Sequence, residues 1–320
     1  MNKRAFAFAA GIALAAPAAA GISALDAALV PLITVADSPA NHLVTAPTWL
    51  DGVAKLVIVR SDGTFGCSGS LIGSGDWVLT AAHCITGASS ATVTFAQASG
   101  APSLSASAFF VNPGWNGVLD HGGDLGLIRL AAAAPAAVTR YDILRDASIT
   151  GITEAVLAGY GISGTGNTGN NAGTYPFGTL RSGINRLDTV YSFIPGEPFA
   201  FDFDNGSTAQ DAIGQLTSGL AADLGLGANE VLTAPGDSGG PSFYGTLIAG
   251  VHSFGATVGP PIDIRDNFVD GSFGELGGDT RTAAYASWID SVTAVPEPST
   301  WAMMLAGLVL LGAGAARRTR

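Results

Sequence analysis

The sequence predicts an all-β protein made of antiparallel strands. Three apolar runs lie close together near the start of the chain, at residues 56–59, 70–72 and 77–80, and turn residues separate them at 61–63 and 73–75. Runs this short, bounded by glycine, serine and aspartate, are typical of strands joined by tight turns. The composition agrees, because 48% hydrophobic and 12% charged residues describe a folded chain, and 44 glycines in 320 residues provide many turn positions.

The first 20 residues have the pattern of a secretory signal peptide. Lys3 and Arg4 precede an apolar run that begins at Ala5, and small residues suited to cleavage surround Ala20. The apolar run is too short to span a bilayer. We therefore expect residues 1–20 to direct export, with a core helix as the alternative, and residues 21–52 to form a separate N-terminal segment.

The other end of the chain, residues 295–320, contains a second apolar stretch. Residues 301–316 carry no charge and would extend roughly 24 Å as a helix, slightly less than a hydrocarbon core of about 30 Å. Arg317, Arg318 and Arg320 follow, and the positive-inside rule keeps them in the cytoplasm. The sequence therefore predicts a separate C-terminal hydrophobic helix that anchors an exported protein in the inner membrane.

Val295, Pro296, Glu297 and Pro298 stand directly before this helix. Motif, short hydrophobic span and terminal arginines occur in the order of the PEP-CTERM sorting tail of Gram-negative bacteria, which this end of the chain closely resembles. The resemblance implies that an exosortase-type processing enzyme cuts near the motif. The membrane anchor would then be transient, and the protein would reach the cell surface or the medium. A permanent single-pass anchor is the alternative.

Charge and cysteine content exclude several classes of function. The two ends hold five of the 14 lysine and arginine residues and one of the 25 aspartates and glutamates, which leaves nine basic against 24 acidic residues. Such an acidic protein is a poor partner for nucleic acid. Cys67 and Cys84 are the only cysteines, and in an oxidising compartment they can form one disulfide. No further cysteine or histidine cluster completes a zinc site, so we expect neither a metal nor a cofactor.

Three short stretches contain the residue types of nucleophilic catalysis. Ser238 follows Asp237 among glycines, which let a substrate approach closely and let backbone N–H groups face a developing oxyanion. His83 follows a predicted strand and precedes Cys84, whose disulfide could hold it in place. Asp124 precedes an apolar strand, where a carboxylate is costly to bury unless a group such as an imidazole N–H bonds to it. Each stretch alone is more often a turn, a structural histidine or an exposed aspartate.

Together these stretches resemble the trypsin and chymotrypsin family of serine proteases over residues 53–292. "LTAAHC" at 79–84, "DLGLIRL" at 124–130 and "GDSGGP" at 236–241 occur in that family's order. The resemblance implies a chymotrypsin-like fold of two six-stranded antiparallel β-barrels with the site in the cleft between them. "YASWIDSV" at 285–292 is similar to the family's short C-terminal helix.

The resemblance also implies an exported serine endopeptidase that forms an acyl-enzyme intermediate. Ser238 would be the nucleophile, His83 the general base and Asp124 the carboxylate that orients the imidazole. The backbone N–H groups of Gly236 and Ser238 would form the oxyanion hole. We expect a monomer that acts on a protein or peptide substrate.

The substrate pocket departs from the family pattern. Leu232 stands where a trypsin-type enzyme has aspartate, whereas Ser253 and Gly255 are similar to the family's substrate-binding Ser-Trp-Gly. We therefore expect cleavage after apolar residues in preference to arginine or lysine. Asp279, near the other expected wall, could restore some preference for basic residues. No Ile-Val-Gly-Gly precedes Val53, which argues against activation by insertion of a new N-terminus.

Two other functions remain open. One is a protease-fold surface protein that binds a polysaccharide or another protein without catalysis, and the other is an esterase that uses the same triad. A further segment, "DFDNGSTAQD" at 202–211, has oxygen ligands at calcium-like spacing but outside the EF-hand register. A solvated loop is the preferred interpretation of that segment, with a calcium site as the alternative.

Overall fold

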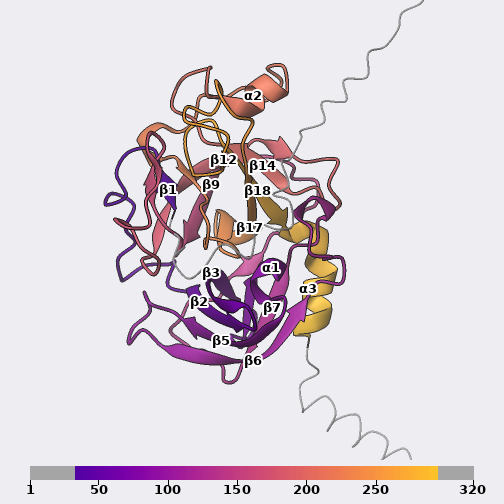
Figure 1. Ribbon diagram of the computed structural model, residues 1–320. Helices are drawn as coiled ribbons and strands as arrows, with labels where there is room; N and C mark the ends of the chain where they lie inside the picture. Colours follow the sequence, from indigo (N-terminus) through magenta and orange to yellow (C-terminus); the bar gives the residue numbers. More distant parts are fainter. Residues whose placement is uncertain (1–32, 295–320) are drawn as a thin grey trace, which may run out of the picture. The chain divides into compact units, whose positions relative to one another are not determined.

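Two β-rich halves make up residues 33–294, the part of the chain that the computed structural model describes. Figure 1 shows the first half as the indigo-to-magenta barrel at the bottom and the second half as the strands above it. The predicted signal peptide, sorting motif and hydrophobic helix lie outside the described residues. Within residues 33–294, no helix has the length and apolar character needed to cross a membrane.

The first half is a closed barrel of six strands in the order β2-β3-β4-β7-β6-β5, with every neighbouring pair antiparallel. The strands are β2 (Val53–Arg60), β3 (Gly63–Ile72), β4 (Trp77–Thr80), β5 (Ala88–Thr94), β6 (Ser103–Val111) and β7 (Gly126–Leu130). The three predicted strand segments fall within β2, β3 and β4. The expected antiparallel barrel is therefore confirmed for this half.

Alternation along β2 explains why this segment is a strand. Leu56 and Ile58 are fully buried, whereas Val57 is partly buried and Val59 is exposed. Side chains two residues apart point to the same face of a strand, so one face of β2 fills the barrel interior. Full burial of a side chain of this size contributes about 1.5–3 kcal/mol.

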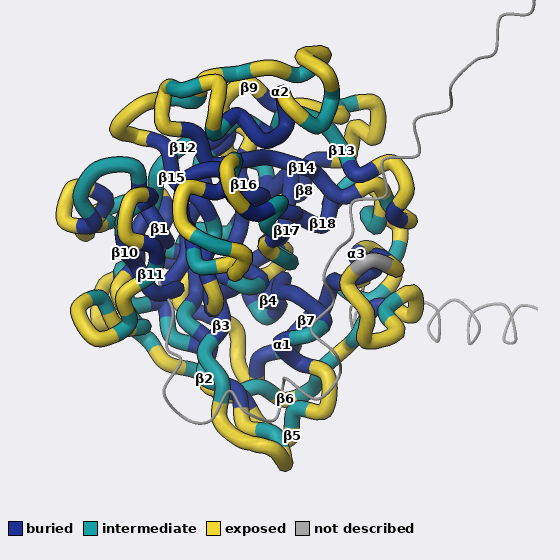
Figure 2. The backbone as a smooth tube through the Cα atoms, turned by 45° about the horizontal axis from the view of Figure 1, so that its top comes forward, coloured by how far each residue is buried: buried dark blue, intermediate teal, exposed yellow. Residues whose placement is uncertain are grey.

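The main sheet of the second half has eight strands: seven follow the order β12-β9-β16-β17-β18-β14-β13, and β8 pairs with β17. They are β8 (Asp142–Ile143), β9 (Ile152–Gly159), β12 (Arg181–Leu187), β13 (Thr189–Val190), β14 (Phe199–Asp202), β16 (Pro241–Tyr244), β17 (Leu247–Ala256) and β18 (Leu276–Arg281). Figure 2 shows their buried segments together, with exposed backbone concentrated in the connecting loops.

The second barrel is open where β12 and β14 face each other. The pairing of β12 with β9 is irregular between Asn185 and Leu187. The Asn185 side-chain amide donates to the carbonyl oxygens of Asp202 and Val231, each at 2.8 Å. These side-chain bonds connect strands that no backbone ladder joins. The all-β, chymotrypsin-like prediction is thus confirmed, with a half-barrel in place of the second closed barrel.

A smaller sheet joins part of the N-terminal segment to the second half. Its order is β11-β10-β1-β15, and its strands are β1 (Thr34–Val35), β10 (Gly164–Thr165), β11 (Gly169–Asn170) and β15 (Val231–Leu232). β1 pairs antiparallel with β15 and parallel with β10. Residues 34–35, which we assigned to a segment ahead of the protease-like domain, therefore form part of its second half.

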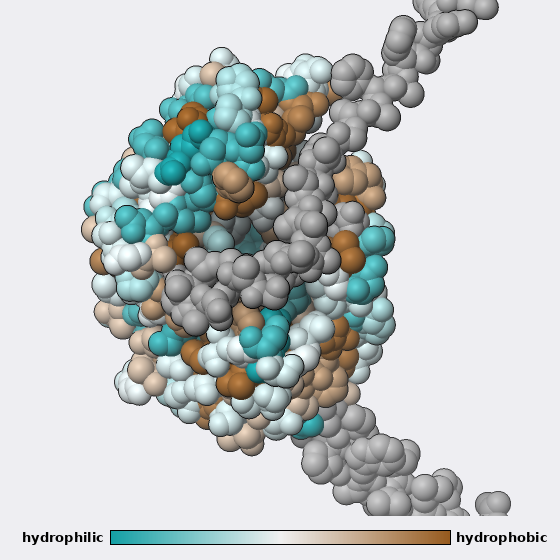
Figure 3. Space-filling model, in the orientation of Figure 1, coloured by the Kyte–Doolittle hydropathy of each residue, from teal (hydrophilic) through white to brown (hydrophobic). Residues whose placement is uncertain are grey.

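Helices are few and short in residues 33–294. They are α1 (Ala82–Ile85), α2 (Ala212–Leu216), α3 (Ala286–Thr293) and the 3₁₀ helices η2 (Leu119–His121), η3 (Gly227–Asn229) and η4 (Thr282–Tyr285). α3 corresponds to the predicted C-terminal helix. On the face shown in Figure 3, hydrophilic side chains gather over the second half at upper left, and hydrophobic ones form small separate patches.

Candidate active site

Strand pairing brings His83 and Asp124 to the same end of the first barrel. β4 ends at Thr80 and runs antiparallel to β7, which begins at Gly126, and the register pairs these two residues. His83 lies just after β4, in α1, and Asp124 lies just before β7. Residues 41 positions apart in the sequence are therefore neighbours in space.

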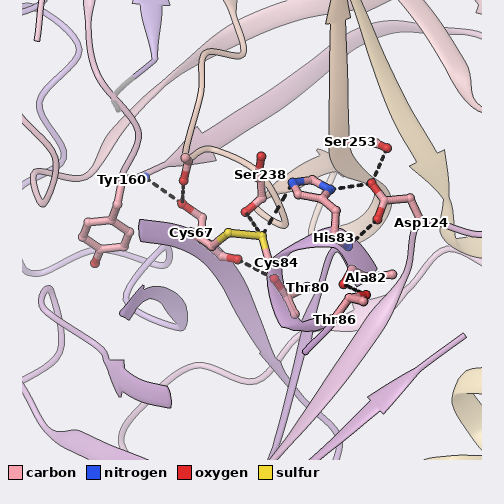
Figure 4. Close-up of a disulfide and its surroundings, with 12 residues drawn as sticks. Cys67, Thr80, Ala82, His83, Cys84, Thr86, Asp124, Tyr160, Ser238 and Ser253 are labelled. Atoms are coloured by element: carbon pink, nitrogen blue, oxygen red, sulfur yellow. Dashed lines mark hydrogen bonds and ion pairs between the residues drawn. A yellow bond between two sulfur atoms is a disulfide. The ribbon is translucent and has the colours of Figure 1, made fainter. Parts of the chain in front are cut away.

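The two side chains form a hydrogen-bonded pair (Figure 4). His83 Nδ1 lies 2.7 Å from Asp124 Oδ2, and the His83 backbone N–H donates to Asp124 Oδ1 at 2.9 Å. The hydroxyl of Ser253, on β17, donates to Asp124 Oδ2 at 2.6 Å. Only 1% of the Asp124 side chain is exposed, against 30% of the His83 side chain. The carboxylate is therefore fixed, and the imidazole is accessible.

Each partner shifts the other's pKa. Burial alone would lower the pKa of the His83 imidazole, but the charge of Asp124 and the bond to it outweigh burial and raise that pKa above 6.5. Burial alone would raise the pKa of the Asp124 carboxyl, yet the charge and hydrogen bonds of His83, with the bond from Ser253, lower it. Asp124 therefore stays ionised, and His83 gains a proton more readily than a free imidazole does.

The predicted disulfide between Cys67 and Cys84 is present. It joins β3 to α1 across a Cα–Cα distance of 6.3 Å, between residues 17 positions apart. Cys84 directly follows His83, so the bridge fixes the short helix that carries the imidazole to a strand of the barrel. A loop of this length gives roughly 3 kcal/mol of stabilisation in the chain-entropy description of cross-links.

Ser238 lies in the turn between β15 and β16, and it meets His83 beside the disulfide. Cys84 Sγ lies 3.5 Å from the Ser238 carbonyl oxygen and 3.8 Å from His83 Nε2, so one sulfur contacts both residues. Ser238 is half-buried. Among residues 33–294, Ser238 Oγ has no hydrogen bond to His83 Nε2. Bonds between a nucleophile and its base often tighten only when a substrate is bound.

In the turn around Ser238, some backbone N–H groups have a hydrogen-bond acceptor and others have none within the described residues. Those of Asp237, Gly239 and Gly240 each donate to a carbonyl oxygen. Those of Gly236 and Ser238 have no acceptor within the described part of the chain. Gly236 has φ +87° and Gly239 has φ +82°, a left-handed conformation that favours glycine. The backbone conformation therefore leaves two donors of one turn free for a ligand.

Ser68, on β3, fastens this turn to the first barrel, and our sequence analysis missed it. Its backbone N–H donates to the Ser238 carbonyl oxygen at 2.9 Å, and its hydroxyl donates to the Gly236 carbonyl oxygen at 3.0 Å. The Tyr160 backbone N–H donates to the same hydroxyl at 2.9 Å. A serine directly after Cys67 was the available signal, because a hydroxyl beside a disulfide in the interior requires hydrogen-bond partners.

Comparison with known proteins agrees with this geometry. Residues 53–184 match the family model described as Trypsin. The chain carries a trypsin-like serine protease fold. Residues 294–319 match the PEP-CTERM protein-sorting motif, which confirms the second resemblance.

Two solved structures illustrate the likeness. Neuropsin, a serine protease expressed in the limbic system of mouse brain, is 21% identical with a TM-score of 0.53, and the match covers 78% of this chain and 98% of neuropsin. HL collagenase is 20% identical with a TM-score of 0.54, over 82% of this chain and 99% of the collagenase. At this identity the likeness shows the fold alone.

Asp237 is fully buried in this trypsin-like fold and is held by backbone groups. Gly161 N–H donates to one carboxylate oxygen at 2.8 Å and Ala234 N–H to the other at 2.9 Å. Burial raises the pKa of Asp237 to about 7, although these bonds and the nearby charges of His252 and Arg181 act in the opposite direction. The carboxylate that precedes Ser238 therefore has its partners within the described chain.

The residues assigned to the substrate pocket lie in different environments. Leu232 is 1% exposed and belongs to a hydrophobic cluster of the second half together with Ile33 and Val35. Gly255 is exposed on β17. Ser253, which we assigned to the pocket, uses its hydroxyl to bond Asp124. Only Ser253 of these three therefore contacts the histidine–aspartate pair, and the pocket role of Leu232 and Gly255 stays a prediction.

Asp279 requires a correction. Its side chain is fully buried, with His252 Nδ1 at 3.0 and 3.2 Å from its two oxygens and the Ser242 hydroxyl at 2.5 Å. Burial acts to lower the pKa of His252, but the charge of Asp279 dominates and raises it. The expectation that Asp279 favours basic substrates is wrong, because the protein's own histidine already pairs with this carboxylate.

Proposed function

We propose that this protein is an exported serine endopeptidase whose triad is Ser238, His83 and Asp124. The main support for this proposal is that His83 Nδ1 bonds to the buried carboxylate of Asp124. The other ring nitrogen, Nε2, lies on the side of the ring where Ser238 lies. A ring bonded this way has Nδ1 as donor, which leaves Nε2 able to accept a proton. The trypsin-like fold supports the assignment.

In the proposed reaction, Ser238 Oγ attacks the carbonyl carbon of a peptide bond while His83 Nε2 takes the hydroxyl proton. His83 then gives this proton to the leaving amine, which departs and leaves an acyl ester on Ser238. A water molecule attacks the ester by the same route, with His83 again accepting and returning the proton. Asp124 holds the imidazole in the required tautomer and stabilises its charged form.

The free N–H groups of Gly236 and Ser238 would stabilise the oxyanion in both steps. In an enclosed site, one such donor contributes about 10²–10³ in rate. Because Ser68 bonds the carbonyl oxygens of the same two residues, this turn is held in one orientation before a substrate binds. We propose residues 53–292 as the protease domain.

Covalent labelling tests the nucleophile. Ser238→Ala should keep the thermal unfolding of the parent and lose all labelling by a fluorophosphonate probe, whereas Ser148→Ala, at an exposed serine, should label like the parent. Equal labelling of Ser238→Ala and parent would overturn the assignment. A protein that is never labelled would instead favour the non-catalytic alternative.

Incubation with a mixed peptide library, followed by mass spectrometry of the cut sites, separates a peptidase from an esterase. We propose that cleavage follows medium or large apolar residues, since an arginine buried against Leu232 would be unpaired and costly. A profile dominated by cleavage after arginine would contradict this specificity. Hydrolysis of activated esters without any peptide cleavage would favour the esterase.

The sorting motif supports the proposed route. We propose that the tail anchors the exported chain transiently in the inner membrane, and that an exosortase-type enzyme cuts near Pro296-Glu297-Pro298 and releases the protease domain to the cell surface or the medium. Mass spectrometry of the C-terminus from native cells tests this. Recovery of a mature chain that still ends at Arg320 would overturn it.

A further inference from the structure

Three aspartates, from the end of β14 to the N-cap of α2, lie buried together in the second half. Asp202, Asp204 and Asp211 are 2%, 3% and 4% exposed, and one carboxylate oxygen from each lies within 4.8 Å of the other two. The preferred interpretation of segment 202–211 as a solvated loop is therefore wrong for these side chains. Burying three carboxylates side by side is costly unless a positive charge or protons compensate them.

The spacing of the three oxygens suits a single hard cation. Calcium binds carboxylate oxygens at about 2.3–2.6 Å, so two of its ligands on opposite sides lie about 4.8 Å apart. Oxygens that are all within 4.8 Å of one another can therefore share one ion. The set contains neither histidine nor cysteine, which disfavours zinc.

Hydrogen bonds fix two of the three carboxylates. Asp202 Oδ2 accepts from the Ile213 backbone N–H at 2.6 Å, and Asp211 Oδ1 accepts from the Gly214 backbone N–H at 2.6 Å as the N-cap of α2. Each of these carboxylates has further lone pairs, because an ionised carboxylate can accept about four bonds. The first turn of α2 thus orients two potential ligands.

One oxygen of Asp204 is buried without a hydrogen-bond partner, which points to a ligand at this place. Its Oδ1 atom is buried and has no hydrogen-bond partner within residues 33–294, although the residue is 97% buried. Buried carboxylate oxygens are almost always paired, and one without a partner needs an explanation. A cation coordinated by this oxygen and by Asp202 and Asp211 provides one.

Neighbouring residues hold Asp204 in place and make the surroundings still more acidic. Glu230 Oε1 accepts from the Asp204 backbone N–H at 2.7 Å, and Glu230 Oε2 accepts from the Leu226 backbone N–H.

We propose that Asp202, Asp204 and Asp211 form a calcium site that fastens the loop between β14 and α2 to the second half. In Figures 1 and 2, α2 lies at the end of the second half away from α1, which carries His83. The ion therefore acts on the stability of this half and takes no part in the reaction. Magnesium fits less well, because it prefers to keep several waters and to bind only one or two carboxylates.

Calorimetry with calcium chloride tests the site directly. The full chain is used as Ser238→Ala, to prevent self-cleavage, after treatment with a chelator. We expect one calcium ion per chain, at least tenfold weaker binding of magnesium, and an unfolding temperature that rises with calcium concentration. Absence of stoichiometric calcium binding to the folded chain would overturn the proposal, and this result does not depend on whether the protein is a protease.

Asp204→Asn, in the same background, separates a ligand from a merely structural residue. In chelator it should unfold at or above the temperature of its parent, because one of three mutually repelling charges is gone. In calcium it should gain little stability and bind at least tenfold more weakly. Asp146→Asn, at an exposed aspartate, is the matched control and should respond to calcium like its parent. A normal calcium response of Asp204→Asn would contradict the site, and if this variant does not fold, Asp211→Asn replaces it, since asparagine still caps a helix.

Discussion

The molecule contains two histidine–aspartate pairs, one in each half. In both, a histidine Nδ1 lies against a carboxylate, at 2.7 Å for His83 and Asp124 and at 3.0 Å for His252 and Asp279. Exposure separates them, because 30% of the His83 side chain is exposed and only 1% of the His252 side chain. The same pairing thus leaves the imidazole accessible in one half and buried in the other.

β17 contributes a hydrogen-bonding residue to each of the two histidine–aspartate pairs. Ser253 and His252 are neighbours on β17, where its pairing with β18 is irregular between His252 and Phe254; Ser253 donates to Asp124, and His252 contacts Asp279. A second serine, Ser242, donates to Asp279 much as Ser253 donates to Asp124. The two pairs therefore have similar chemistry and differ in how far the histidine is exposed.

Replacing His83 should have the largest effect. His83→Ala removes the proposed base, and because a triad acts as a unit, kcat should fall by about 10⁴–10⁶ with the fold retained. Steady-state hydrolysis of an activated ester measures the fall, and circular dichroism checks the fold. His252→Gln is the comparison and should keep kcat within about tenfold of the parent. Similar losses in the two variants would show that burial does not distinguish the pairs.

Asp124→Asn should lower kcat by about 10⁴ and change the pH dependence. Protonated His83 cannot accept a proton, so activity rises as pH increases through the pKa of His83, which Asp124 raises above 6.5. Without the carboxylate charge that pKa falls, and the acid limb of kcat/KM should move to lower pH. Asp279→Asn should leave the limb where it is in the parent. A shift of the same size in both variants would contradict the assignment.

His252→Gln should chiefly change stability. Removing His252 leaves the buried Asp279 charge without its partner, and breaking a buried pair in this way costs about 3–5 kcal/mol. Urea unfolding followed by fluorescence measures the loss. His42→Gln provides a control, because the partner of His42, Asp37, is partly exposed. A loss no larger than that of the control would mean that solvent or another group satisfies Asp279.

Loss of the disulfide should have a somewhat smaller effect. Cys67→Ser with Cys84→Ser should lower the free energy of unfolding by about 3 kcal/mol, since the cross-link no longer restricts the unfolded chain. Urea unfolding of the double variant and of the reduced parent should agree. If the parent is equally stable with and without reductant, the bridge contributes nothing, and its role is confined to the position of His83.

Local patterns explain what the sequence could predict. The strands β2, β3 and β4 were visible because each has an apolar run bounded by turn residues, and His83, Asp124 and Ser238 were visible because each stands in a short motif next to such a strand. The geometry of a turn or of a strand end depends on residues close in sequence, so a motif can specify it.

Long-range register explains most of what could not be predicted. His252 meets Asp279 only because the β17–β18 register pairs these two positions. No spacing of residues in the sequence predicts this pairing. The contacts of the Asn185 amide with the Asp202 and Val231 carbonyl oxygens likewise join residues far apart in the sequence. Asp204 lies in a polar, glycine-containing segment that has the composition of a solvated loop, and only the packing of the second half shows it to be buried.

Ser68 joins two parts of the chain that a single cut in an exposed loop would place on different fragments. It belongs to β3, yet its backbone and hydroxyl bonds end on the turn that carries Ser238. A chain split in the exposed residues 145–148 would leave His83 and Asp124 on one fragment and Ser238 on the other. Probe labelling of the mixed fragments would then report their association into a folded protein. A Ser68 variant would show how much the Ser68 bonds to the turn of Ser238 contribute to that association.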